Sequence, residues 1–208
     1  MLKRINVFIG GSSDISISQK YIDIALELGK KINERDYNIV FDGCYGLPFL
    51  TFSELNDSTN SIILRTEKYN NNYIYKTGAM LHECRDQSEF TRCILKESDA
   101  FIFMKGKTAT LSEIMYVINA KKNKEHDKPI IIMNINNEWD ELCNLLNTLG
   151  IDSTYYITDN VIDALNHLEK ELFNKNSNFY KLYVSPSCYI NRTKPIIEEN
   201  NSKELKLL

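Results

Sequence analysis

Short apolar runs alternate along most of the chain with stretches in which apolar residues recur every three or four positions. Runs of β-branched and aromatic residues predict strands, and the helically spaced stretches predict amphipathic helices. Strands that are wholly apolar indicate a parallel sheet covered on both faces, so the pattern predicts one α/β domain. The expected strands cover residues 5–9, 38–41, 61–64, 100–104, 130–133 and about 155–157. The expected helices cover residues 19–35, 47–55, 87–97, 139–149 and 159–173, with one more that opens after residues 105–109.

Two segments depart from this alternation. Residues 66–79 are polar and rich in Tyr and Asn, which predicts a loop over one end of the sheet, where Tyr73 and Tyr75 could form a lid. Residues 174–208 are rich in Asn, Ser and Lys and form a C-terminal extension to a domain of residues 1–173. This extension either docks on the domain or is partly disordered, and both alternatives stay open at this point.

Composition narrows the class of protein. The 208 residues are 43% hydrophobic and 25% charged, as in a globular protein. The net charge of −3 provides no basic field of the kind that draws proteins to nucleic acid or anionic membranes. The apolar runs are too short to cross a bilayer, and residues 1–4 leave no room for a signal peptide. The five cysteines are scattered without a C-x-x-C pair, and the three histidines are dispersed, so we expect free thiols, no metal and a cytoplasmic location.

Small, polar and glycine residues follow three of the predicted strands, at residues 10–14, 42–46 and 105–110. Ligands of open parallel sheets bind beyond the carboxyl ends of the strands, where helix N-termini offer free N–H groups to an anion. Each loop alone is explained by a tight turn, but three on one rim favour a nucleotide phosphate beside the fourth predicted strand. The expected binding residues are Gly11, Ser12, Ser13, Gly43, Gly106, Lys107, Thr108, Ala109 and Thr110.

The common phosphate-binding motifs do not fit this chain. A P-loop would need glycine at position 101, which is Phe, and no G-x-G-x-x-G sequence follows the first strand. Glu113 lies one turn into the helix that opens at residues 105–110, and two roles stay open for it. It either pairs with Thr110 in a capping box or places a carboxylate beside the phosphate for glycosidic-bond chemistry.

Several motifs together resemble the LOG family, the cytokinin riboside 5′-monophosphate phosphoribohydrolases often called lysine decarboxylases. They are residues 7–13, 43–47, 98–113 and 128–130, followed by Trp139-Asp140 and residues 157–159, in family order. The resemblance spans roughly residues 5–173. It implies a Rossmann-like, doubly wound parallel sheet with helices on both faces, a homodimer, and a small-molecule nucleotide as the partner.

The family signature P-G-G-x-G-T-x-x-E falls on residues 105–113 of this chain. Gly106, Thr110 and Glu113 match it, whereas Lys105, Lys107 and Ala109 replace the proline and two glycines. In the family this turn holds the 5′-phosphate and the glutamate serves the cleavage of the N-glycosidic bond. Lys107 could contact phosphate as a point charge or lie in solvent.

Members of the family also place an arginine of the preceding helix in the site. The resemblance implies that an arginine here acts in catalysis beside Glu113. Arg92 lies closest to that position, two residues out of register, and Arg85 is a second candidate. Either could instead be a surface arginine.

The resemblance implies hydrolysis of a nucleoside 5′-monophosphate to free base and ribose 5-phosphate, without a cofactor. A modified pyrimidine monophosphate is a related substrate class. Two alternatives remain: a non-catalytic nucleotide sensor or carrier, which the altered glycine turn favours, and a structural relic whose turn admits no phosphate. Lysine decarboxylation is not expected, because nothing in the sequence provides a pyridoxal phosphate site.

Overall fold

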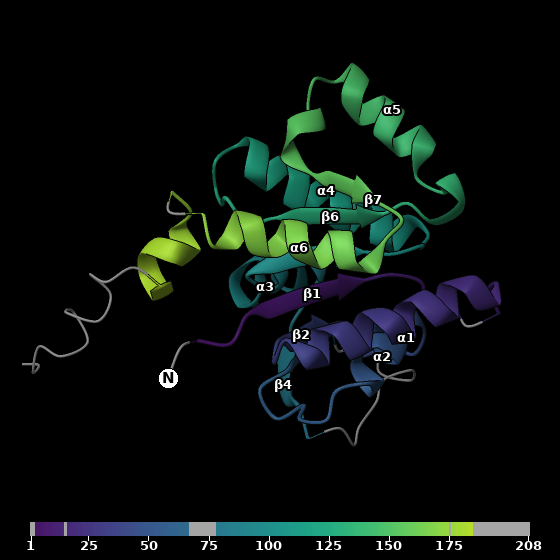
Figure 1. Cartoon of the computed structure of the whole chain (residues 1–208), viewed down its shortest axis with the longest axis vertical. Coiled ribbons are helices and arrows are strands. Elements are labelled where there is room, and N and C mark those ends of the chain that lie inside the picture. The colour runs from purple at the N-terminus through teal and green to yellow at the C-terminus, as the bar shows by residue number, and fades with distance from the viewer. Residues whose placement is uncertain (1–2, 15, 67–77, 175, 185–208) are drawn as a thin grey trace, which may run out of the picture.

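A computed structural model describes residues 3–14, 16–66, 78–174 and 176–184 of the chain. Within these residues, seven strands form one parallel sheet with six α-helices packed against it (Figure 1). The strands are β1 (Asn6–Gly10), β2 (Asn38–Phe41), β3 (Ile62–Thr66), β4 (Met80–Cys84), β5 (Ala100–Phe103), β6 (Ile130–Met133) and β7 (Tyr156–Thr158). The helices are α1 (Gln19–Glu34), α2 (Leu47–Ser53), α3 (Gln87–Glu97), α4 (Thr108–Lys122), α5 (Asp140–Thr148) and α6 (Val161–Leu172).

The strand order is β4-β3-β2-β1-β5-β6-β7. The chain therefore builds outward from β1 to one edge, returns to β5 on the other side of β1, and continues to the opposite edge. Val7 of β1 pairs with Ala100 of β5, while Phe8 pairs with Val40 of β2. This reversal beside β1 is the topological switch point of a doubly wound sheet, and the Rossmann-like fold is confirmed.

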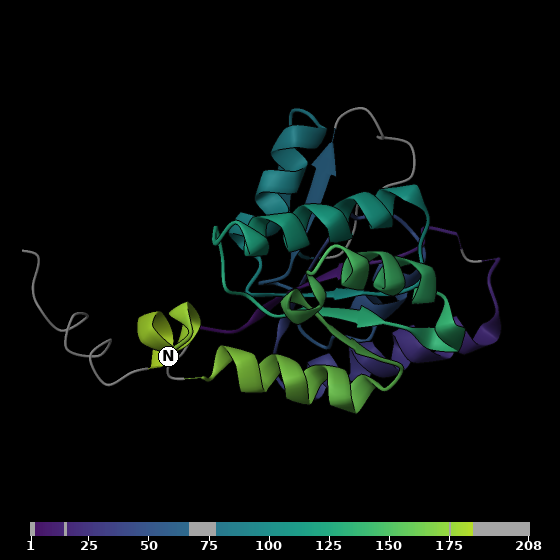
Figure 2. The same cartoon turned by 90° about the horizontal axis from the view of Figure 1, so that it is seen from above.

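Two hydrophobic cores lie on opposite faces of the sheet, because successive strand residues point to opposite sides. Phe8 belongs to one core and its neighbour Ile9 to the other. Helices α1, α2 and α6 cover the face that contains Ile9, and α3, α4 and α5 cover the face that contains Phe8. Figure 2 shows the resulting three layers of helix, sheet and helix.

The sequence-based prediction missed β4. Among the described residues this strand pairs only with β3, and Met80 and Leu81 are about half exposed, so it lacks the apolar run by which the central strands were found. The fourth predicted strand is consequently β5. Helix α2 ends at Ser53, two residues earlier than predicted, whereas α3 and β6 have the predicted bounds. Residues 67–77, with the predicted lid tyrosines, lie outside the described residues.

The beginning of the C-terminal extension docks on the domain. The described part of the extension includes a π-helical turn (Tyr180–Val184) beside α6, and Phe179 is buried in the core that α6 covers (Figure 1). Lys3 Nζ lies 4.7 Å from the ring centroid of Tyr183. Residues 185–208 lie outside the described residues. Among the helices that the structure describes, none combines the length and apolarity required to cross a membrane.

Candidate functional site

The three predicted loops meet at the switch point and are joined there by backbone hydrogen bonds. Ser12 N donates to Lys105 O at 2.7 Å, which ties the loop after β1 to the loop after β5. Leu47 N donates to Ser12 O at 2.9 Å, which adds the loop after β2. One rim of three polar loops therefore exists where the sequence predicts it.

Close packing explains why this rim needs glycine. A Cβ at Gly10 would lie 2.5 Å from Phe103 Cδ1 and 3.1 Å from Glu113 Oε2. A Cβ at Gly106 would lie 2.1 Å from Thr110 Oγ1. Gly46 has a φ of 113°, in the region that favours glycine, and a Cβ there would lie 2.1 Å from Ser12 O. The loops are thus held as close to one another as backbone atoms allow.

Glu113 lies at the centre of this packing. It comes from α4, is 8% exposed, and directs its carboxylate at Gly10. Burial raises the pKa of Glu113 well above its ordinary value of 4.5, and the negative charge of Asp42 raises it further. The capping-box role considered for Glu113 is wrong, because Lys107 occupies the N-cap and Thr110 lies inside the helix.

Asp42 and Cys44 belong to the same site, although the sequence singled out only the glycine between them. Asp42 follows the buried strand β2, and its Oδ1 accepts a hydrogen bond from Cys44 N at 3.0 Å. Burial raises the pKa of Asp42. Burial, followed by the charges of Asp42 and Glu113, raises the pKa of the Cys44 thiol to about 12. Gly43, with a φ of 73°, turns the chain between the two side chains. The rim thus contains two carboxyl groups that disfavour each other's charge.

The turn that begins α4 is open to solvent. Lys107, Thr108 and Ala109 are exposed, while Thr110 is buried. No side chain caps the helix, so its first N–H groups remain free for an anion. Lys107 has a side chain that is 81% exposed, and its Nζ lies 3.6 Å from Asp14 Oδ2 across the rim. The Lys107 ammonium therefore lies over the loop after β1.

The residues of the loop after β1 divide between packing and exposure. Ser12 is buried, and its Oγ accepts a hydrogen bond from Asp14 N at 3.1 Å. Ser13 is exposed and Gly11 is partly buried. Ser13 is consequently the hydroxyl of this loop that is free to face a ligand.

The two candidate arginines, Arg92 and Arg85, both lie at exposed positions. Helix α3 buries Phe90, Cys93 and Ile94, whereas Arg92 is exposed. Arg85 donates from Nε to Glu89 Oε2 at 2.9 Å, and its side chain is 79% exposed. Within the described parts of the chain, neither arginine forms an ion pair with a residue of the rim. A catalytic role for Arg92 therefore rests on the family resemblance.

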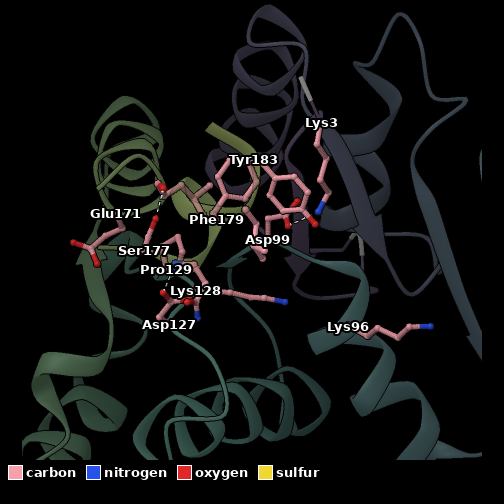
Figure 3. Close-up of a pocket in the computed structure, with 13 residues that line it drawn as sticks. Lys3, Lys96, Asp99, Asp127, Lys128, Pro129, Glu171, Ser177, Phe179 and Tyr183 are labelled. Atoms are coloured by element: carbon pink, nitrogen blue, oxygen red, sulfur yellow. Dashed lines mark hydrogen bonds and ion pairs between the residues drawn. The ribbon is translucent and has the colours of Figure 1, made fainter. Parts of the chain in front are cut away.

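A cavity of about 190 Å³ lies at the amino ends of the strands, away from the rim (Figure 3). Two of its lysines already have partners. Lys3 Nζ lies 2.6 Å from Asp99 Oδ1, and Lys128 Nζ donates to Ser98 O at 2.6 Å. Phe179 and Tyr183 of the C-terminal extension complete its wall. The docked part of the C-terminal extension packs against this cavity, which lacks the carboxyl pair of the rim.

Comparison with known proteins identifies relatives of this chain. The family described as "Possible lysine decarboxylase" matches residues 54–172, more than half of the chain. Cytokinin riboside 5′-monophosphate phosphoribohydrolase LOG1 of Arabidopsis thaliana is 24% identical over 91% of this chain and 97% of its own length. The probable phosphoribohydrolase LOG6 of the same plant is 30% identical over 67% of this chain and 70% of its own.

Solved structures show the same fold. The molybdenum cofactor carrier protein of Chlamydomonas reinhardtii superposes with a TM-score of 0.66 at 12% identity, over 83% of this chain and all of its own. The molybdenum cofactor binding protein of Rippkaea orientalis has a TM-score of 0.63 at 15% identity, over 84% of this chain and all of its own. Taken with the sequence matches, these findings show that the chain belongs to the LOG family, the family whose model is described as "Possible lysine decarboxylase".

Proposed function

We propose that the protein hydrolyses the N-glycosidic bond of a nucleoside 5′-monophosphate and releases free base and ribose 5-phosphate. The observation that carries this proposal is the buried Glu113 carboxyl, which lies against Gly10 at the switch point and interacts with Asp42. The relatives that bear phosphoribohydrolase names support the same reaction class.

The phosphate would bind at the start of α4. The free N–H groups of residues 108–110 and the positive end of the helix dipole attract a dianion. The Lys107 ammonium would exchange its ion pair with Asp14 for a contact with phosphate. Glu113 lies five residues beyond Thr108, about 7.5 Å along the helix axis, which is the scale of a ribose between its 5′-phosphate and C1′. A phosphate held here therefore brings C1′ toward the carboxyl pair.

The two carboxyl groups would then divide the chemistry. Glu113, protonated because of its raised pKa, would donate its proton to the base as the C1′–N bond breaks. The positive charge that develops on the ribose would be stabilised by the Asp42 carboxylate. Water would attack C1′ and lose a proton, which restores Glu113. This division follows from the pKa shifts: that of Glu113 is raised well above its ordinary value, whereas at Asp42 the rise caused by burial is opposed by the hydrogen bond from Cys44 N.

The test is release of free base from a panel of purine and pyrimidine nucleoside 5′-monophosphates by the full-length chain. We expect wild-type release, loss of at least about 100-fold in Glu113→Gln, and unchanged activity in Glu125→Gln, an exposed acid beyond the end of α4. Nucleosides without phosphate should be poor substrates. No release from any monophosphate, or equal activity in Glu113→Gln, would overturn the proposal.

A second candidate is a nucleotide sensor or carrier of the same fold that does not cleave its ligand. It is favoured by Lys107 and Ala109 in place of the family glycines and by the exposed positions of Arg92 and Arg85. The solved relatives of similar fold include proteins named as molybdenum cofactor carriers. Tight nucleotide binding without base release, measured by calorimetry on the same panel, would establish this alternative.

A further inference from the structure

Three side chains with metal-ligating atoms converge between β4 and α3. His82 and Cys84 lie two residues apart on β4 and so point to the same face of the sheet. Cys93 reaches them from α3, and the three ligand atoms all lie within 4.8 Å of one another. The sequence predicts no metal because the histidines are dispersed. The partners of His82 are two cysteines, and the packing of α3 against β4 is what brings Cys93 close to it.

The separation of one pair of these atoms, His82 Nε2 and Cys93 Sγ, matches zinc coordination. Zn²⁺ binds thiolate at about 2.3 Å and imidazole at about 2.0–2.1 Å, so tetrahedral geometry sets the sulfur and nitrogen about 3.6 Å apart. His82 Nε2 lies 3.5 Å from Cys93 Sγ. Cys84 Sγ approaches the His82 carbonyl oxygen only to 4.0 Å, the limit for a weak sulfur contact. The Cys93 thiol thus lies within reach of a weak hydrogen bond to His82 Nε2, and it also hydrogen-bonds with the Cys84 thiol.

The other ring nitrogen of His82 faces a carboxylate. His82 Nδ1 lies 3.9 Å from Glu97 Oε1, and Glu97 is one helical turn beyond Cys93 on α3. Metal-bound histidines usually direct their second nitrogen to a carboxylate or carbonyl, which fixes the tautomer and orients the ring. Nε2 toward the thiols and Nδ1 toward Glu97 is the arrangement that a zinc ligand requires.

Burial and donor type further restrict the ion. Cys84 and Cys93 are 1% and 6% exposed, whereas the His82 side chain is 33% exposed and leaves a path from solvent. Two sulfurs and one nitrogen favour Zn²⁺ over Mg²⁺ and Ca²⁺, which prefer oxygen. The cluster is separated from β1 by β3 and β2, about 14 Å of sheet, so it lies apart from the carboxyl pair of the rim.

We propose that His82, Cys84 and Cys93 bind one Zn²⁺ with a fourth position open to water, and that Glu97 orients His82. The ion joins the edge strand β4 to α3. The role of the ion is to hold β4, an edge strand of the described sheet, against α3. This inference is independent of the proposed function.

The primary test is a zinc titration of the full-length, reduced, metal-free protein in competition with a chromophoric chelator. We expect one equivalent to bind, and Co²⁺ in place of Zn²⁺ should give thiolate-to-metal charge-transfer absorption. Cys84→Ser and Cys93→Ser should each remove the stoichiometric site. Cys143→Ser, which changes a buried cysteine of α5 outside the cluster, is the matched control and should bind as wild type.

Variants at two partly exposed positions, Glu97 and His82, test the proposal even if a serine variant fails to fold. Glu97→Gln should lower zinc affinity by about 10–100-fold without abolishing binding. His82→Ala should remove the site while circular dichroism shows an intact fold. Zinc at a hundred times its Kd should raise the Tm of the wild type, and not of His82→Ala, by roughly 5–10 °C. Absence of stoichiometric binding to the reduced wild type, or wild-type affinity in both serine variants, would overturn the proposal.

Discussion

At the scale of single residues, the burial of Glu113 links the site to stability. Its neighbours in the rim are close-packed backbone, and the group whose charge acts on it is another carboxyl, Asp42. Among the described residues, no lysine or arginine forms an ion pair with either acid. The charged form of Glu113 is therefore unfavourable in the folded protein, and the site retains a proton at a pH where a free glutamate has lost it.

Replacing Glu113 with Gln should consequently stabilise the protein at neutral pH. The raised pKa means that the folded state binds more protons than the unfolded state above about pH 4.5, so the free energy of unfolding falls as pH rises through this window. Glu113→Gln stays neutral and lacks this fall, so its advantage over wild type should grow as the pH rises above about 4.5, until Glu113 ionises in the folded protein. Urea denaturation at several pH values measures the effect, with Glu125→Gln as the exposed control. A variant that is less stable than wild type across this range would contradict the raised pKa.

The sequence predicted some residues of the site and not others for a physical reason. Glu113 and the turn before it are contiguous in the chain, so one helix and its dipole suffice to place them. Asp42 comes near Glu113 because β2 lies directly beside β1, and strand order is not written in local patterns. The signal that could have indicated Asp42 was an acidic residue directly after a fully buried strand.

At the scale of elements, the start of α4 differs most from the family signature. A lysine at the N-terminus of a helix opposes the helix dipole unless an anion is present. Lys107 is also the N-cap and forms no side-chain capping bond, so it contributes nothing to the helix by itself. Its presence at this position is explained by a bound phosphate, or by the pairing with Asp14.

Lys107→Ala should therefore weaken nucleotide binding while leaving the chemical step intact. An exposed charge contact of about 1 kcal/mol corresponds to roughly a fivefold rise in KM, with kcat unchanged because the phosphate is held equally in ground and transition states. Lys122→Ala, at the opposite end of the same helix, is the matched control. Kinetics at low and moderate salt would show the loss. An unchanged KM would place Lys107 in solvent, the other alternative that its sequence position allows.

The missed strand shows where element prediction fails. The central strands are wholly buried, and their continuous apolar runs are sufficient to find them. The sequence Met-Leu-His-Glu-Cys of β4 has no such run, because an edge strand is covered on fewer sides. The same omission hid the convergence of His82, Cys84 and Cys93, which depends on β4 lying under α3.

At the scale of the whole molecule, Lys3 and the docked residues 176–184 lie together at the amino side of the sheet. Lys3 and Phe179 line the same cavity, and Asn178 N donates to Asp127 Oδ2 at 2.7 Å. The functional rim lies at the opposite, carboxyl side, so the extension and the site occupy separate ends of the domain. The homodimer implied by the family resemblance stays a prediction.

The docked part of the extension should contribute to global stability. Phe179 is 8% exposed, and its ring centroid lies 5.1 Å from that of Tyr183 and 6.1 Å from that of Phe173. Phe179→Ala removes a buried ring at the margin of the core, so the free energy of unfolding should fall by about 2–4 kcal/mol. The expected decrease in Tm is about 4–16 °C for a domain of this size.

Phe173→Ala provides the matched comparison, because that ring is 43% exposed and neighbours Phe179. Its effect on the Tm should be less than half that of Phe179→Ala, since burial and not aromatic contact supplies most of the stabilisation. Equal effects of the two substitutions, or no effect of Phe179→Ala, would show that residues 176–184 do not dock. Base release should be unaffected by either change, because the rim and the docked segment lie at opposite ends of the strands.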